Sequence, residues 1–175
     1  MAKLKKMLDT TSPQIQTLMR LIPEQSLTTV CGWALDYANE YIYPIYQNKV
    51  KPEKAVKKCL TVSKAFIDGG CNRKEKKAVR EAVSDARTSI NMYELPLTAE
   101  IAARCCASVA AAAYNTPTVL SLALYGGMAV AYETLGMGRE QNEYDEYALT
   151  ECDKMIEALK KVSVENETNP CNCVF

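Results

Sequence analysis

Residues 101–135 read IAARCCASVAAAAYNTPTVLSLALYGGMAVAYETL, and this stretch decides the fold. It contains no charged residue between Arg104 and Glu133. The triplet Asn115-Thr116-Pro117 divides it in two. A threonine hydroxyl can cap a helix and proline is favoured at a first helical position, so a new helix should start there. We therefore predict two buried helices in antiparallel contact, the second capped by Thr116.

Both segments are apolar enough to be compared with membrane-spanning helices. A span needs roughly 20 consecutive apolar residues, and neither half reaches that length without interruption. The polar triplet would also lie in mid-membrane, where its backbone groups would have no water to bind. We expect the pair to form the core of a water-soluble domain that does not contact a membrane.

Two adjacent glycines, Gly126 and Gly127, lie inside the second of these helices. A glycine in a helix costs about 1 kcal/mol relative to alanine, so another interaction has to offset that cost. Close approach of another backbone is the simplest candidate. The small side chains of residues 102–113 would provide the flat surface that such an approach needs.

Apolar residues recur at helical spacing along the rest of the chain. Pro13 and Pro52 open two of these segments, while Gly69-Gly70 and Gly136 end two others. After Val164 the chain becomes polar and loses this spacing. The sequence predicts an all-α fold, a single-domain bundle of about seven helices around the buried small-residue helical hairpin of residues 101–135. The domain covers residues 1–175, with residues 165–175 as a flexible tail.

The segment from Pro23 to Tyr46 carries two patterns at once. Trp33, Tyr37 and Tyr41 follow one another every four residues and predict an aromatic ridge on one side of a helix. Pro44 should kink or end that helix, because proline has no N–H to donate. Beside the ridge we predict a buried stripe consisting of Leu27, Val30, Cys31, Ala34, Ala38, Tyr41 and Ile45.

Charge and cysteine content restrict the classes of function. Lys+Arg and Asp+Glu are balanced at 21 each, so net charge gives no attraction toward nucleic acid, and we expect no direct nucleic-acid binding. Residues 1–6 alternate charged and apolar side chains instead of forming a signal segment, so we expect a cytoplasmic protein. In that compartment the eight cysteines should be reduced and serve mostly as small core residues.

The chain contains no histidine, which removes the commonest general base and the commonest metal ligand. Cys105 and Cys106 are neighbours on a helix, so their side chains diverge by about 100° and do not readily share a metal. Cys171 and Cys173 form a C-x-C pair that could bind a soft metal or oxidise, although an unordered tail is the simpler interpretation. We expect no catalytic residue, no cofactor and no metal ion.

One predicted surface stretch combines carboxylates with tyrosines. Acidic residues at the start of a helix favour its dipole, which accounts for Glu140 and Glu143. The dipole explains less well the later carboxylates and the two tyrosines, and such a mixture suits a basic protein partner. The residues that we predict to bind a partner are Glu140, Glu143, Tyr144, Asp145, Glu146 and Tyr147.

Several segments, in order, resemble a known helical family. They are Cys31-Gly32-Trp33-Ala34, then Pro52-Glu53-Lys54-Ala55-Val56, then Ala107-Ser108-Val109-Ala110-Ala111-Ala112-Ala113, followed by Thr116-Pro117 and a small-residue helix through Ala131. With these segments the chain resembles the helical "immunity five-like" family of immunity proteins from bacterial polymorphic toxin systems. Members of that family carry histidines around the alanine-rich hairpin, whereas this chain has Tyr114 and Tyr125 nearby.

The resemblance implies a non-enzymatic protein that binds and neutralises a cognate protein toxin. A basic nuclease-type domain is the kind of toxin that an acidic surface suits. The alternative is a helical protein that binds a small ligand or metal through the Trp33/Tyr37 ridge or the tail cysteines. An enzyme would have to work through Asp, Glu, Lys, Tyr or Cys alone. The sequence leaves open the oligomeric state and the face that binds.

Overall fold

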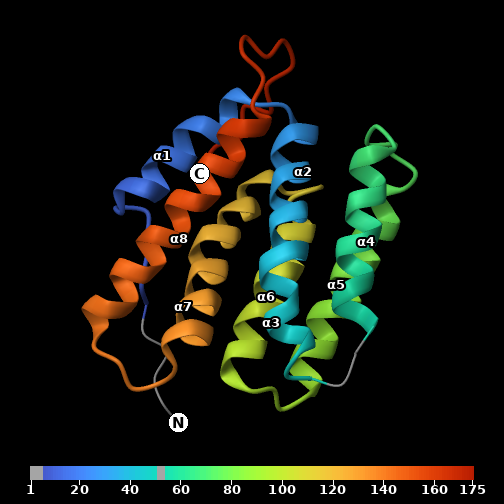
Figure 1. Ribbon diagram of the computed structural model, residues 1–175. Coiled ribbons are helices and arrows are strands. Elements are labelled where there is room, and N and C mark those ends of the chain that lie inside the picture. Colours follow the sequence, from blue (N-terminus) through green and yellow to red (C-terminus); the bar gives the residue numbers. More distant parts are fainter. Residues whose placement is uncertain (1–5, 51–53) are drawn as a thin grey trace.

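The computed structural model describes residues 6–50 and 54–175, and this part of the chain is helical without a strand (Figure 1). Its α-helices are α1 (Pro13–Leu21), α2 (Leu27–Tyr37), α3 (Tyr43–Gln47), α4 (Lys54–Asp68), α5 (Lys76–Met92), α6 (Leu97–Ala111), α7 (Gly127–Leu135) and α8 (Gln141–Val162). Four shorter segments are the 3-10 helices η1 (Ile22–Glu24) and η3 (Thr116–Leu120) and the π-helical segments η2 (Ala38–Ile42) and η4 (Leu122–Gly126).

These elements combine into seven continuous helical rods within the described residues. The π-helical segment η2 joins α2 to α3, while η3 and η4 lead directly into α7, and η1 continues α1. The predicted all-α bundle of about seven helices is therefore confirmed. Pro52, predicted to open the third helix, lies outside the described residues, and α4 is described from Lys54.

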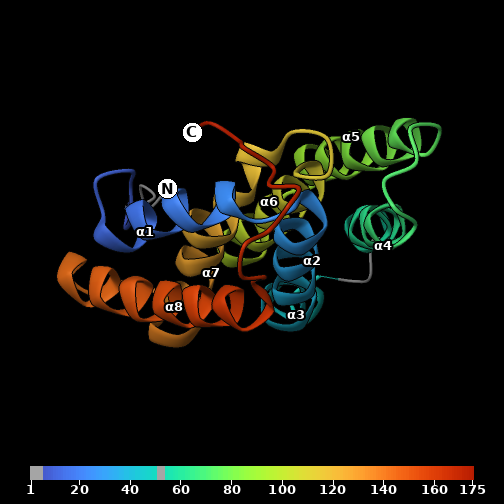
Figure 2. The same cartoon turned by 90° about the horizontal axis from the view of Figure 1, so that it is seen from above.

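Helix α6 is the centre of the fold. It packs against α2, α3, α4, α5 and the segment 116–135, and Figure 2 shows it between α7 and the α4–α5 pair. Cys105 and Cys106 point about 100° apart and yet are both fully buried, so neighbours cover most of the helix and leave the row of Glu100, Arg104 and Ser108 with exposed surface. Only small side chains let so many helices approach one axis. Ser63 of α4 also donates its hydroxyl to the carbonyl oxygen of Ala110 at 3.1 Å, which satisfies a carbonyl near the end of α6.

The segment 116–135 runs antiparallel to α6, as predicted. The thiol of Cys105 lies 3.4 Å from the carbonyl oxygen of Ser121, whereas Ile101, one turn earlier, borders a small pocket together with Met128. The prediction that Thr116 caps this segment is wrong. Asn115, and not Thr116, occupies the position before the first turn, and no side chain caps the free N–H groups there. Thr118 instead donates its hydroxyl to the Asn115 carbonyl oxygen at 2.8 Å.

Among the described residues, one helical rod, Thr116–Leu135, is long and apolar enough to cross a membrane. Half of its most apolar window is buried inside the protein, and core helices of soluble proteins meet the same criterion. Its buried side is covered by α6 and by α8. The rod therefore serves as a packed core element of this fold.

The rod formed by α2, η2 and α3 differs from the predicted buried stripe and from the predicted kink at Pro44. Tyr41 is 49% exposed and Ile42 is fully buried, so the buried stripe moves by one residue after Ala38. The π-helical segment η2 causes this shift, because a π turn holds one more residue than an α turn. The wider turn also lets the chain pass Pro44 and continue into α3, so the proline neither ends the rod nor breaks it.

Residues 165–175 leave α8 and fold back over η1. The backbone N–H of Cys171 donates to the Gln25 carbonyl oxygen at 2.8 Å, and that of Asn172 donates to the Pro23 carbonyl oxygen at 3.2 Å. The buried side chain of Gln25 holds the end of α8 through both the N–H and the carbonyl of Val164. The segment has no helix, and its predicted flexibility stays a prediction.

Gly126 and Gly127 face different neighbours. A Cβ on Gly126 would lie 3.3 Å from the Cys105 sulfur and 3.3 Å from Cδ1 of Ile42, which is a tight contact. A Cβ on Gly127 would lie 3.6 Å from the Ala148 carbonyl oxygen, at ordinary van der Waals distance. The predicted close approach to α6 therefore holds for Gly126, through a side chain of α6, whereas Gly127 faces α8.

We expect alanine to separate the two glycines. Gly127→Ala should raise the free energy of unfolding by up to about 1 kcal/mol, because helix propensity is gained without a clash. Gly126→Ala should lose that gain against Cys105 and Ile42, and Gly126→Leu should destabilise the protein by about 1–3 kcal/mol or more through overpacking. Thermal and urea unfolding of the three variants would measure this. Equal stabilisation by both alanines would contradict the assignment.

Candidate functional site

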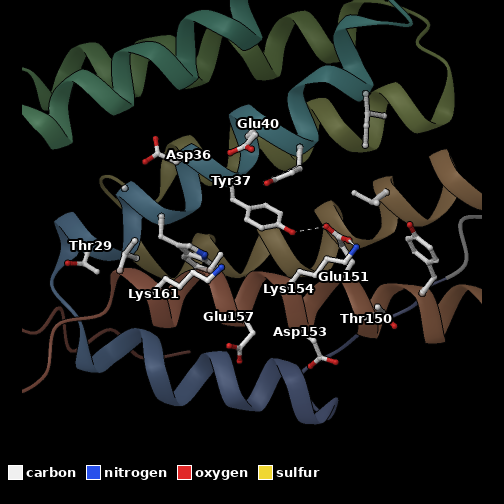
Figure 3. A pocket seen from close by; sticks show the side chains of 18 of the residues that line it. Thr29, Asp36, Tyr37, Glu40, Thr150, Glu151, Asp153, Lys154, Glu157 and Lys161 are labelled. Carbon is white, nitrogen blue, oxygen red and sulfur yellow. Dashed lines mark hydrogen bonds and ion pairs between the residues drawn. The ribbon is translucent and has the colours of Figure 1, made fainter.

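Helices α2 and α8 lie antiparallel and form the floor of a surface groove. Trp33 donates its indole N–H to the Met155 carbonyl oxygen at 3.1 Å. One turn further along α2, Tyr37 donates its hydroxyl to Oε1 of Glu151 at 2.7 Å, one turn earlier on α8 (Figure 3). These two bonds fix the register of α2 against α8, two helices that lie far apart in the sequence.

The groove has a volume of about 1120 Å³. It is bordered from Thr28 to Tyr41 along α2 and η2 and from Tyr147 to Val162 along α8. At 1.5 Å per residue these borders are about 20 Å long. A depression of this length has room for several consecutive residues of a polypeptide, whereas small-ligand sites are mostly compact pockets of roughly 300–1,000 Å³.

The predicted aromatic ridge lines this groove. Trp33 and Tyr37 are buried in its floor and Tyr41 stands at its mouth, with the rings of Tyr37 and Tyr41 centred 4.6 Å apart. The ridge is therefore confirmed as a structural feature. The one change is that the π turn at η2 leaves Tyr41 outside the core, so its ring remains exposed at the surface.

Glu151 is the one buried carboxylate among residues 6–50 and 54–175, with 4% of its surface exposed. Two donors hold it: the Tyr37 hydroxyl on Oε1 and the ammonium of Lys154, 2.9 Å from Oε2. Burial, together with the hydrogen bond to Glu151, raises the pKa of the Tyr37 phenol far above its usual range, so it stays a donor. The hydrogen bond to Glu151 also raises the pKa of Lys154.

Carboxylates outnumber lysines along the groove. Its lining includes Lys154 and Lys161, against six acidic residues: Asp36, Glu40, Glu133, Glu151, Asp153 and Glu157. Figure 3 shows Asp36 and Glu40 on the α2 side and Asp153 and Glu157 on the side of α8 that faces α1. Lysines from outside the groove contact three of these acids, in the pairs Lys64–Asp36, Lys49–Glu133 and Lys160–Glu157, 3.1, 2.9 and 2.8 Å long. Exposed pairs of this kind contribute only about 0–1 kcal/mol each.

The predicted partner-binding residues lie at the start of α8, and several are engaged inside the protein. Glu140 and Glu143 form a reciprocal capping box, in which each carboxylate accepts the backbone N–H of the other residue. Asp145 accepts a hydrogen bond from the Gln141 amide at 2.7 Å. Glu146 is exposed, and Tyr147 is half-buried and borders the groove.

Tyr144 corrects that prediction, because it is a core residue with 1% of its surface exposed. Its hydroxyl donates to the Gly136 carbonyl oxygen at 2.7 Å and accepts from the Arg139 N–H, and its ring packs on Tyr132. It belongs to the apolar stripe of α8 and closes the turn between α7 and α8. The other five predicted residues keep surface that a partner could reach, since Glu140 and Glu146 are exposed and the Glu143 side chain is 42% exposed.

The eight cysteines are free thiols. Burial raises the pKa of the Cys31, Cys59 and Cys152 thiols to about 12, which makes them poor nucleophiles at neutral pH. The Cys171 and Cys173 sulfurs lie 3.7 Å apart beside η1. In the described part of the chain, no three His, Cys, Asp or Glu side chains are grouped in a way that could hold a metal ion.

The sequence pointed to both walls of the groove separately but not to the groove. Trp33 and Tyr37 stood out by their spacing, and Glu151 is a carboxylate just after the acidic stretch. Their contact depends on pairing between residues 114 positions apart, which no local pattern encodes. The one local sign of this contact is that Glu151 lies in an otherwise apolar helical stripe, between Ala148 and Met155.

Comparison with known proteins gives one finding. The family model described as "Imm-5 like putative immunity protein" matches residues 20–158, which is most of the chain and includes the groove lining apart from Lys161 and Val162. No curated protein matches the chain, and no solved structure does.

The Tyr37–Glu151 bond should contribute measurably to stability. Tyr37→Phe removes the buried donor to Glu151 Oε1 and should lower the free energy of unfolding by about 1–3 kcal/mol. The control is Tyr41→Phe, at an exposed ring one turn away, which should change it by less than about 0.5 kcal/mol. Urea denaturation followed by the fluorescence of Trp33, the single tryptophan, would measure both. Equal effects of the two variants would show that this bond does not stabilise the fold.

Proposed function

We propose, from the premise that this chain belongs to the Imm-5 like family of immunity proteins, that it binds a cognate bacterial protein toxin and neutralises it without catalysing a reaction. The observation that carries this proposal is the groove between α2 and α8. It combines length, aromatic surface and acidic borders on one face, and the family match covers most of both walls.

The groove suits a polypeptide for physical reasons. Binding energy at protein interfaces is concentrated in a few desolvated aromatic or arginine contacts, and Trp33, Tyr37 and Tyr41 provide aromatic surface in one row. Surrounding charges mostly set the association rate and the choice of partner. Tyr147 borders the groove, and the exposed Glu146 lies on the same side of α8 as the groove residue Asp153, seven residues later, so part of the surface predicted from the sequence adjoins the groove. Asp145 faces away from the groove, toward Gln141 and the N-terminal segment.

The partner that this face suits is a basic toxin domain, such as one that acts on nucleic acid. Proteins that approach phosphates carry clustered lysines and arginines, and an acidic surface can occupy that cluster in place of the nucleic acid. This mode of neutralisation requires no reactive group on the immunity protein. It would operate in the cytoplasm, where we propose that the chain resides.

A second candidate function is the binding of a small ligand by the Trp33/Tyr37 ridge, and the aromatic floor of the groove favours it. The polar atoms of that floor are already used, since the Trp33 N–H and the Tyr37 hydroxyl bind Met155 and Glu151. A small ligand would therefore have few donors to orient it. Native mass spectrometry of the purified protein would distinguish the two candidates, because a tightly held ligand would add a defined mass.

Charge reversal on the exposed part of this face tests the proposal. The double variant Glu146→Lys, Asp153→Lys should slow association with the cognate toxin and weaken the salt dependence of that rate. The capping residues Glu140 and Glu143 stay unchanged, because their loss would affect the helix itself. Stopped-flow or surface plasmon resonance at two salt concentrations would measure the rates, and growth of toxin-expressing cells would report neutralisation.

The matched control is the double variant Glu81→Lys, Glu94→Lys, which makes the same change in net charge on and just after α5. Figure 2 shows α5 on the opposite side of the molecule from α8. This control should bind the toxin as the unmodified protein does. The absence of binding and of growth rescue by the unmodified protein would overturn the proposed function. Equal slowing by both double variants would instead place the interface elsewhere.

A further inference from the structure

The buried carboxylate of Glu151 is an unusual feature of the groove floor. Moving a carboxylate out of water costs several kcal/mol, and a buried ion pair often stabilises a protein no more than apolar residues of the same size. Stability alone therefore gives a weak reason for an acid at this position. The arrangement of its two partners suggests a role in binding.

The two oxygens of Glu151 are held very differently. Oε1 is bound by Tyr37, whose side chain is buried and packed beneath Tyr41. Oε2 is bound by Lys154, whose side chain is 59% exposed and reaches in from the surface of α8. A lysine with most of its surface in water can leave at small cost, because its ammonium is strongly hydrated. Oε1 is thus held firmly by Tyr37, whereas another cation can replace Lys154 at Oε2.

The surroundings of Oε2 favour a guanidinium over an ammonium. An arginine can donate two N–H groups to a carboxylate while its flat face stacks on an aromatic ring. Tyr41 offers such a ring at the mouth of the groove, with its centre 4.6 Å from the centre of the Tyr37 ring that binds Glu151. Arginine is also more weakly hydrated than lysine, so it loses less on entering a half-buried site. Glu40 on one border and Asp153 on the other form no ion pair within the described residues, and they attract a cationic segment toward this point.

We propose that the groove binds a basic polypeptide segment and that one arginine of this segment pairs with Glu151 and displaces Lys154. This inference rests on the proposed function, in which the segment belongs to the toxin. Lys154 then acts as an internal substitute that neutralises Glu151 until the partner arrives. Tyr37 keeps the carboxylate in place throughout, so it is a positioning residue.

A short peptide tests this site without the toxin. The probe is an acetylated, amidated hexaarginine peptide, and the hexacitrulline peptide is its uncharged counterpart of nearly the same shape. Trp33 lies in the groove floor and is the single tryptophan, so its fluorescence reports occupation of this groove. We expect hexaarginine to change that fluorescence saturably, hexalysine to bind more weakly and hexacitrulline to have no effect.

Two pairs of charge-matched variants locate the contact. Lys154→Met should bind hexaarginine about five- to tenfold more tightly, because the competing cation is gone. Lys77→Met, the same change at an exposed residue of α5, should leave binding unchanged. Glu151→Gln should weaken binding about tenfold or more, whereas Glu81→Gln should not. Circular dichroism would verify the fold, and Lys154→Met keeps the test decisive if Glu151→Gln unfolds.

The outcomes separate this inference from the proposed function. Equal effects within each matched pair would show that hexaarginine binding depends only on the net charge of the protein, and would overturn the proposed contact with Glu151. Neutralisation of the toxin by the unmodified protein, with toxin affinity unaffected by Lys154→Met and Glu151→Gln, would also overturn it while leaving the proposed function intact. A groove that binds arginine as expected in a chain that neutralises no toxin would instead overturn the assignment of the segment to a toxin.

Discussion

The central constraint on this protein is that α6 is buried on all sides but one, where Glu100, Arg104 and Ser108 form a narrow row that reaches solvent. A helix surrounded by five neighbours cannot carry large side chains in all directions, because their bulk would push the neighbours out of contact. The run of alanine, cysteine and serine in α6 meets that requirement. The remaining helices then take positions set by how closely they can approach this axis. The larger side chains of the core are contributed by those outer helices, as with Leu18, Val79 and Ile156.

The two π-helical segments adapt the outer rods to that axis. They meet where Ile42 of η2 packs on Gly126 of η4, beside the sulfur of Cys105. Each π turn adds one residue, so it rotates the buried face of the following helix. In the second rod this rotation buries Ile42 and moves Tyr41 to the surface. The same irregularity that completes the core thus places an aromatic ring at the mouth of the groove.

The groove links packing to function. Helices α2 and α8 are joined through Trp33–Met155 and Tyr37–Glu151, so their outer surfaces form a shallow channel instead of a smooth face. Because the polar groups of the floor bind one another, the channel stays shaped without a partner, and little ordering is needed when one binds. A preorganised channel with aromatic surface and carboxylates on its borders fits the proposed binding of a basic protein domain. It asks for no catalytic group, in keeping with an immunity role.

The sequence by itself determined the helical class, the buried hairpin of residues 101–135 and the aromatic spacing of Trp33, Tyr37 and Tyr41. These features depend on interactions within a few turns of helix, or on a composition that allows only burial. The tertiary structure decided the register after Ala38, the burial of Tyr144 and the pairing of Tyr37 with Glu151. The first and the last depend on contact between segments far apart in the chain, Ile42 on Gly126 and α2 on α8, whereas Tyr144 is buried by contact across the turn between α7 and α8, on Tyr132 and Gly136. Periodicity shows that a face is buried, but only packing against a particular neighbour decides which residue of the turn fills the gap and which polar group finds a partner.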